Sequence, residues 1–278
     1  MPAFLALLSS LIWGTSDFLG GTATRRIPGP VVVGLSQLVA LLALAPIAVL
    51  VGGDGTSYVV PGIAAGTVGC VSLAAFYRAL ATGTMGVVAP IASLGVVVPV
   101  VVGLARGEAP GTLQVAGIAA AVVGVVLASG PELSGAAGAR PLLLSAMSAL
   151  GFGTALVLVA QGSRGGGVVR VLLVLTVMRI SSVLLLTVLL VLTRSWRLPV
   201  SGRDLPVLAA IGLGDVLANA AYGVASQGGL LSVVAVLGSV YPVMTVLLAR
   251  QLHHERLRPI QLAGVGTALA GVVLLAAG

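Results

Sequence analysis

The stretch PVVVGLSQLVALLALAPIAVLVG, residues 30–52, decides the fold class, because it contains no charged side chain. A run of about 20 apolar residues is the length that crosses the hydrocarbon core of a bilayer as an α-helix. Of the 278 residues, 58% are hydrophobic and 8% are charged. A soluble domain has about 25% charged residues. The composition therefore excludes a water-soluble globule and predicts an integral membrane protein.

Ten apolar runs of this kind occur along the chain, separated by short breaks rich in turn residues and Arg. They are continuous rather than alternating, which excludes the strands of a membrane β-barrel. No basic residue precedes the first run, so we interpret it as a retained helix and not as a signal peptide. The sequence predicts an all-α protein with ten transmembrane helices, at 3–22, 30–52, 58–81, 85–105, 111–130, 141–161, 170–193, 205–226, 230–250 and 260–277. Pro90, Pro99 and Pro242 predict kinks in the fourth and ninth helices.

The chain repeats itself. A shift of 147 residues lays Glu108 on Glu255, a shift of 145 lays Tyr77 on Tyr222, and a shift of 139 lays Trp13-Gly14-Thr15 on Phe152-Gly153-Thr154. These matches predict a five-helix unit at 1–131, a connecting loop at 132–140 and a second five-helix unit at 141–278. Because five is odd, the second unit enters the membrane from the opposite face, as in the inverted repeats of secondary transporters.

Three stretches resemble EamA-type members of the drug/metabolite transporter superfamily. The stretch from Trp13 to Phe18 is similar to the signature of their first helix. Tyr77-Arg78-Ala79-Leu80 with Val88-Ala89-Pro90-Ile91 resembles the junction of their third and fourth helices. The strongest match runs from Tyr241-Pro242-Val243 through His254-Glu255-Arg256 to Gln261-Leu262-Ala263-Gly264. His254 stands where the family usually has Gly.

The resemblance implies a secondary active transporter that exports or exchanges small polar or amphipathic metabolites by alternating access, with proton coupling left open. It names no substrate, because the family handles amino acids, sugars, nucleotide derivatives and toxic compounds. The expected partners are a small metabolite and membrane lipid, in a monomer or homodimer. The exclusive use of Arg as the basic residue and the 39 glycines are typical of a GC-rich bacterial genome, so we expect the protein in a bacterial inner membrane. An integral-membrane enzyme and a sensor or scaffold that transports nothing remain alternatives.

Several other functions are excluded. The basic residues are all Arg and lie between apolar runs, so they indicate membrane topology and not nucleic-acid binding. A single cysteine, Cys70, allows neither an internal disulfide nor a thiolate cluster. His253-His254-Glu255 forms a turn without further ligands, and we expect no metal and no cofactor. The chain has no phosphate loop and no Ser/His/Asp set, so we expect neither an ATP-driven pump nor an enzyme.

Apart from Arg170 and Arg250 at helix ends, four charged side chains lie within the predicted helices, where a charge is costly and usually faces a cavity or a partner. They are Asp17, Arg78, Arg179 and Asp215. Their depths along the helices predict two ion pairs, Asp17 with Arg78 and Arg179 with Asp215. Asp17 is either a carboxylate that couples transport to a proton or cation, or half of a structural pair. Arg78 can also extend its head to the membrane interface.

Other polar and aromatic side chains complete the candidate site. Asp215, Asn219, Tyr222 and Ser226 share one face of the eighth helix, which must face protein or water. Whether this stripe lines a cavity or joins two helices is open, as it is for Ser36, Gln37, Ser232, Ser239 and Tyr241. The candidate cavity and coupling residues are Trp13, Asp17, Gln37, Tyr77, Arg78, Arg179, Asp215, Asn219, Tyr222, Ser239 and Tyr241.

The orientation in the membrane is predicted differently by two arguments. We call the face that carries the first loop side A and the face that carries the predicted termini side B. Side A carries Arg25, Arg26, Arg140, Arg194, Arg197, Arg203, Arg250, Arg256 and Arg258, and side B carries Arg106, Arg164 and Arg170. The preference of cytoplasmic loops for positive charge puts side A in the cytoplasm. The family resemblance implies the reverse.

Overall fold

All regular secondary structure in the described part of the chain is helical, and this part contains no strand. The computed structural model describes all residues except 54, 84, 130–138, 193–199, 254–257 and 278. The first half contains α1 Pro2–Thr24, α2 Gly29–Val51, α3 Val59–Thr82, α4 Met85–Ser93, η1 Leu94–Val96, α5 Val97–Ala105 and α6 Thr112–Ser129. The second half contains α7 Ala139–Gly162, α8 Gly167–Leu192, α9 Leu205–Gly228, α10 Leu231–Gly238, α11 Tyr241–Leu252 and α12 Pro259–Ala277. The predicted connecting loop at 132–140 lies almost entirely outside the described residues.

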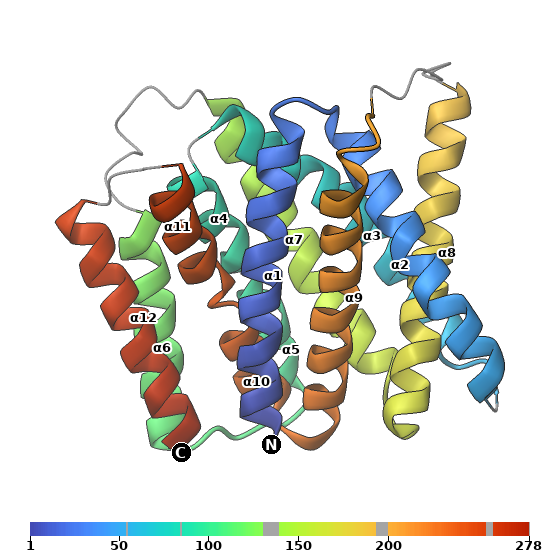
Figure 1. Ribbon diagram of the computed structural model, residues 1–278. Helices are drawn as coiled ribbons and strands as arrows, with labels where there is room; N and C mark the ends of the chain where they lie inside the picture. The colour runs from blue at the N-terminus through green and yellow to red at the C-terminus, as the bar shows by residue number, and fades with distance from the viewer. Residues whose placement is uncertain (54, 84, 130–138, 193–199, 254–257, 278) are drawn as a thin grey trace.

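Among the described residues, eight helical segments are long and apolar enough to cross a membrane, two fewer than the ten predicted. They are α1, α2, α3, the α4–α5 segment from Val88 to Ala105, α7, α8, α9 and the α10–α11 segment from Leu231 to Leu252. The two predicted helices outside this set, α6 and α12, pack against each other at one edge of the bundle (Figure 1). The structure is therefore a membrane helical bundle with eight apolar spans.

Two of the spans are interrupted near their middle, where the sequence predicts kinks. A 3₁₀ turn at η1 separates α4 from α5, and Pro99 lies in the first turn of α5. In the second half α10 ends at Gly238, and Pro242 lies in the first turn of α11. A proline lacks the backbone N–H that continues a helix, so it is tolerated at the start of the segment that follows a break. Pro90 lies within α4 without ending it.

The two halves pack through reciprocal contacts. Helix α1 packs on α9, and α3 packs on α7; α2 packs on α8, and α6 on α12. The broken span of each half also contacts the first helix of the other, since α10 and α11 lie against α1 while α4 and α5 lie against α7. Replacing each helix by its counterpart in the other half returns the same set of contacts. The halves therefore interlock as two similar units.

Two glycines show this correspondence at atomic detail. A Cβ atom added at Gly14 of α1 would meet the carbonyl oxygen of Tyr241, at the break between α10 and α11. A Cβ atom added at Gly153 of α7 would meet the carbonyl oxygen of Gly95, at the break of the fourth span. Small residues at these positions let the helix backbone approach the break closely. Gly14 and Gly153, which the repeat aligns, therefore make the same kind of packing contact in the two halves.

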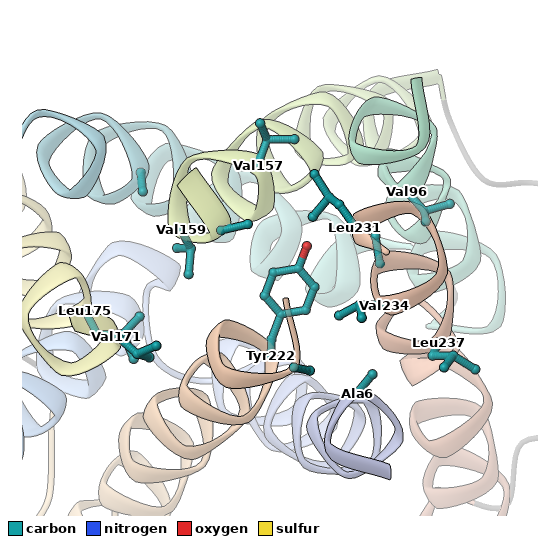
Figure 2. Packing of buried hydrophobic residues seen from close by; sticks show 14 of the residues in the cluster. Ala6, Val96, Val157, Val159, Val171, Leu175, Tyr222, Leu231, Val234 and Leu237 are labelled. Atoms are coloured by element: carbon teal, nitrogen blue, oxygen red, sulfur yellow. The ribbon is translucent and has the colours of Figure 1, made fainter. Parts of the chain in front are cut away.

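Buried apolar side chains form two clusters at opposite ends of the bundle. The cluster at side B, which we call the B-end cluster, surrounds Tyr222 and includes Ala6, Leu231, Val234 and Leu237 (Figure 2). The cluster at side A, the A-end cluster, includes Phe18, Phe76, Tyr77, Leu80 and Met85. Tyr77 and Tyr222, which the repeat aligns, therefore occupy equivalent places in the two clusters.

Candidate functional site

A cavity of about 100 Å³ lies in the middle of the bundle, between the two clusters. Its walls come from α1 to α4 and η1 of the first half and from α7 to α11 of the second. None of its described lining residues belongs to α6 or α12. The first four spans of each half therefore build the cavity, and the edge pair of helices stands outside it.

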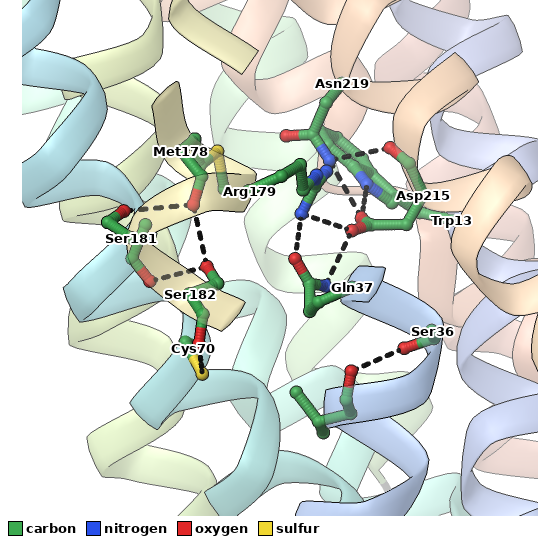
Figure 3. Close-up of polar contacts among 12 residues, drawn as sticks. Trp13, Ser36, Gln37, Cys70, Met178, Arg179, Ser181, Ser182, Asp215 and Asn219 are labelled. Atoms are coloured by element: carbon green, nitrogen blue, oxygen red, sulfur yellow. Dashed lines mark hydrogen bonds and ion pairs between the residues drawn. The ribbon is translucent and has the colours of Figure 1, made fainter. Parts of the chain in front are cut away.

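Asp215 of α9 is the centre of the polar wall (Figure 3). Its Oδ2 atom lies 2.9 Å from Nη1 of Arg179, an ion pair that the matched depth of the two residues predicts. Trp13 donates a hydrogen bond from Nε1 to Oδ1 at 3.2 Å, and Gln37 donates from Nε2 to Oδ2 at 3.4 Å. Asn219 donates from Nδ2 to Oδ1 at 2.8 Å, one turn along the same helix. One carboxylate thus joins α1, α2, α8 and α9.

Gln37 and Arg179 occupy corresponding positions of the two halves. A Cβ atom added at Gly66 would meet the backbone oxygen of Met178, and one added at Gly212 would meet that of Ser36, so the second helices correspond at a shift of 142. Gln37 and Arg179 are separated by 142 residues, and Nη1 of Arg179 donates to Oε1 of Gln37 at 2.6 Å. Two positions related by the repeat can touch only where the halves meet. The polar wall therefore lies on the pseudosymmetry axis.

The Arg179 guanidinium is deeply buried. Its side chain is 1% exposed, while that of Asp215 is 17% exposed. Its Nε and Nη2 atoms have no hydrogen-bond partner among the described residues. A buried ion pair adds little net stability, because both groups lose hydration, but removal of one partner leaves an uncompensated charge. The pair therefore places two mutually neutralising charges in the wall of the cavity.

Asp17 contributes a second carboxylate to the cavity, one helical turn after Trp13. It is 8% exposed, and its carboxylate has no hydrogen bond or ion pair with any described residue. The predicted salt bridge with Arg78 is wrong, since Arg78 is exposed on the surface of α3 while Asp17 points inward. The two residues lie at similar distances from the side A ends of their helices, but their side chains point in different directions.

The structure brings eight of the eleven candidate residues to the cavity and leaves three elsewhere. Those at the cavity are Trp13, Asp17, Gln37, Arg179, Asp215, Asn219, Ser239 and Tyr241. The hydroxyl of Tyr241 is buried without a hydrogen-bond partner in the described chain. Arg78 is exposed, and Tyr77 and Tyr222 lie in the clusters at the two ends. Ser226, also on the predicted stripe, bonds to the backbone of its own helix.

Sequence reasoning missed several lining residues, among them Cys70, Ser93, Phe152, Met178 and Ser182. Phe152 carried a usable signal, because the repeat aligns it with Trp13. Ser182 also carried a signal, because it lies three residues after the candidate Arg179 and so shares its face of α8. The small residues at the cavity were indistinguishable from packing residues.

Glu108 lies between α5 and α6 of the first half. Its carboxylate accepts hydrogen bonds from the backbone N–H groups of Leu231 at 2.7 Å and Ser232 at 3.0 Å, and from the Ser232 hydroxyl at 2.7 Å. It therefore caps α10 of the opposite half. Its repeat mate Glu255 lies outside the described residues.

His253 lies at the opposite end of the molecule from Glu108. Its Nε2 atom is 3.3 Å from the hydroxyl oxygen of Thr22, and its ring packs against Phe18. Partial burial, with the positive charge of Arg25 nearby, lowers the pKa of His253 below its ordinary value. No group of three or more potential metal ligands occurs among the described residues, and His254 and Glu255 lie outside them. The side chain therefore joins α1 to the end of α11.

Comparisons with known proteins agree with this architecture. A solved structure titled "Crystal structure of protein" shares 18% identity with the chain and superposes with a TM-score of 0.77, covering 98% of this chain and 95% of that one. A comparison with curated proteins finds no match. The model of the EamA-like transporter family matches residues 1–130 and again residues 139–277. The chain therefore belongs to the EamA-like transporter family and contains two copies of its repeat.

Proposed function

We propose that this protein is a secondary active transporter that exports or exchanges small polar or amphipathic metabolites by alternating access. One observation carries the proposal: a central cavity with a polar wall is enclosed about equally by two units that pack through reciprocal contacts. Such a construction has two equivalent arrangements, in which the cavity opens to one face or to the other.

The proposal includes ten transmembrane helices in two inverted repeats, in a bacterial inner membrane. Both termini lie at the same end of the bundle (Figure 1). Helices α6 and α12 pack against each other. Helix α6 would be the fifth span of the first unit, and α12 the fifth span of the second. An odd number of spans per unit inverts the second unit, and inversion makes the two faces of the membrane structurally equivalent.

The two apolar clusters act as the seals of the cavity. Each holds one member of the aligned pair Tyr77 and Tyr222, at opposite ends. If each half takes up the arrangement of the other, the packing of one cluster loosens while the packing of the other tightens. The hydrogen bonds of Glu108 to α10 strengthen the seal at side B. The broken spans supply the hinges, because a helix break absorbs backbone rotation that a continuous helix resists.

The first experiment is an export screen. Cells that overproduce the wild-type chain are compared with cells that overproduce Asp17→Asn, and extracellular metabolites are quantified. We expect at least one small metabolite to accumulate outside only with the wild-type chain. That metabolite is then tested for flux in proteoliposomes with and without a pH gradient. The absence of flux for every exported compound would contradict the proposal and favour a sensor or an enzyme.

A further inference from the structure

We propose that Arg78 and Arg140 form a binding site for the phosphate of an anionic phospholipid, in the membrane leaflet at side A. The site lies on the outer surface of α3 and α7, away from the cavity, so the inference does not depend on the transport function. It comes from the place of the two arginines on apolar helix surfaces, from the absence of a partner for either one in the described chain, and from the alignment of α3 with α7.

Arg78 lies on the outward surface of α3. The same surface carries Val60, Ile63 and Val71, which are 75%, 47% and 52% exposed. Arg78 is also exposed and follows Val71 by seven residues, which is about two helical turns. It precedes the end of the helix at Thr82 by four residues, or about 6 Å along the axis. A long side chain at this depth extends its charged head from the apolar surface to the headgroup layer at side A.

Arg140 has the corresponding place on the neighbouring helix α7. It is exposed and lies in the first turn, three residues before Leu143, which is 63% exposed. A Cβ atom added at Gly83, just after α3, would lie 3.0 Å from Cβ of Pro141. The beginning of α7 therefore lies beside the end of α3, and both arginines belong to the same side of the membrane.

A hydrogen bond fixes how the two helices align. The Ser148 hydroxyl of α7 donates to the backbone oxygen of Ser72 in α3 at 3.0 Å. Arg78 lies six residues after Ser72, and Arg140 lies eight residues before Ser148. Because the helices run in opposite directions, the two arginines differ in level by about two residues, or about 3 Å along the axes. Two long side chains on adjacent helices at this spacing can reach one phosphate.

Neither arginine has an ion pair or a side-chain hydrogen bond with any described residue. Every carboxylate of the described chain is engaged elsewhere: Glu108 caps α10, Asp204 pairs with Arg26, Asp215 pairs with Arg179, and Asp17 lines the cavity. The described protein therefore supplies no negative charge to Arg78 and Arg140, and an anion from outside the chain can bind there.

The chemistry of the site favours an anionic phospholipid. A guanidinium group presents a rigid fork of N–H donors that binds two oxygens of a phosphate. Basic sites between membrane helices bind anionic headgroups in this way. The apolar surfaces next to the two arginines accept the acyl chains, which a free phosphate ion lacks. The phosphate of phosphatidylcholine is already balanced by its own ammonium group, whereas that of phosphatidylglycerol is not.

The site belongs to the first half alone. The shift that lays Tyr77 on Tyr222 lays Arg78 on Gly223, which has no side chain. An element of the cavity that both halves share would recur in the second half. The loss of Arg78 should therefore leave the cavity and its polar wall intact.

The test counts the lipids that stay on the protein. The purified chain in detergent is titrated with phosphatidylglycerol or with phosphatidylcholine of the same acyl chains, and native mass spectrometry measures the affinity of each successive lipid. We expect the first phosphatidylglycerol to bind at least about fivefold more tightly than the first phosphatidylcholine, with no such preference for later lipids. An excess of inorganic phosphate should not displace it, because the acyl chains contribute to binding.

Four variants complete the test. Arg78→Gln and Arg140→Gln remove one charge each and should lower the preference to less than about twofold. Arg78→Lys keeps the charge but loses the fork, and should show an intermediate preference. Arg106→Gln is the matched control, since Arg106 is exposed at side B, and should leave the preference unchanged. Thermal unfolding verifies that each variant is folded.

Equal affinity of the wild-type chain for the two lipids would overturn the inference. An unchanged preference in the folded Arg78→Gln and Arg140→Gln variants would overturn it as well. Displacement of phosphatidylglycerol by inorganic phosphate would identify a site for small anions instead. An equal loss in Arg106→Gln would assign the preference to the net charge of the protein and would also contradict the site.

Discussion

At the scale of single residues, the Arg179–Asp215 pair has the clearest energetic consequences. We predict that Arg179→Met or Asp215→Leu alone destabilises the protein by about 3–5 kcal/mol, because each leaves an unpaired buried charge. The double variant removes both charges and should regain most of that loss. Unfolding in detergent measures the three free energies. Transport should remain absent in the double variant, and restored transport would show that the pair serves only the fold.

His253 gives a prediction for pH. Its pKa in the folded protein lies below that of the unfolded chain, so the unfolded chain binds a proton more readily. The contribution of His253 to stability is therefore complete above the unfolded pKa of about 6.5 and declines as the pH falls below it. The melting temperature should drop between pH 7.5 and pH 5, and His253→Gln should show a smaller drop. An equal drop in both proteins would assign the effect to other groups.

The residues also show the limit of sequence reasoning at this scale. The Arg179–Asp215 pair could be predicted, because depth along a helix follows from the number of residues to its end. The Asp17–Arg78 pair failed although the same rule applied, because depth does not fix the direction in which a side chain points. On helices that are apolar on every side, no periodicity marks the inward face. The direction is set by packing of the two halves.

At the scale of helices, the close approach of α1 to the break between α10 and α11 is testable. We predict that Gly14→Ala and Gly153→Ala each destabilise the protein by about 1–3 kcal/mol, because the new Cβ meets a backbone oxygen that cannot rotate away. Gly266→Ala in α12 is the matched control, since a Cβ there meets nothing within 4 Å. Thermal unfolding of the three variants should separate the first two from the third. A stable Gly14→Ala variant would show that the break can shift at little cost.

The capping of α10 by Glu108 gives a second prediction for an element. Hydrogen bonds to a charged group contribute about 1.5–3 kcal/mol each, although not additively. Glu108→Ala should lower stability by about 1–3 kcal/mol and open the end of the cavity at side B. Glu108→Gln keeps one acceptor and should lie between it and the wild type. The rate at which Cys70 is labelled from side B should be lowest in the wild type, higher in Glu108→Gln and highest in Glu108→Ala.

Helix bounds and helix breaks were predicted well, because they follow from the order of residues along the chain. Contacts between distant segments were predicted less well, because they depend on packing. Helix bounds follow from runs of apolar residues, and the breaks between α4 and α5 and between α10 and α11 follow from Pro99 and Pro242. The partnership of Glu108 with α10 could not be predicted, because it joins segments 123 residues apart. The count of ten spans likewise rests on α6 and α12, which are not among the eight spans found in the described residues.

At the scale of the whole molecule, the orientation is open to a direct experiment. The excess of Arg on side A predicts that side A is cytoplasmic and that both termini lie outside the cytoplasm. A carboxy-terminal fluorescent-protein fusion should then be dark and a phosphatase fusion active. The opposite pair of signals would show that the topology implied by the family holds, and that the Arg-rich loops surround the outer mouth of the cavity.

Alternating access is the central claim, and Cys70 tests it most directly. It is the only cysteine of the chain, it is 3% exposed, and it lines the cavity between the two seals. The measurement is labelling of Cys70 by a small membrane-impermeant thiol reagent in right-side-out and in inverted vesicles, with Cys70→Ser as the blank. The account predicts that Cys70 is labelled from both faces of the membrane, each more slowly when cargo is present. Labelling from one face alone, at any cargo concentration, would contradict it.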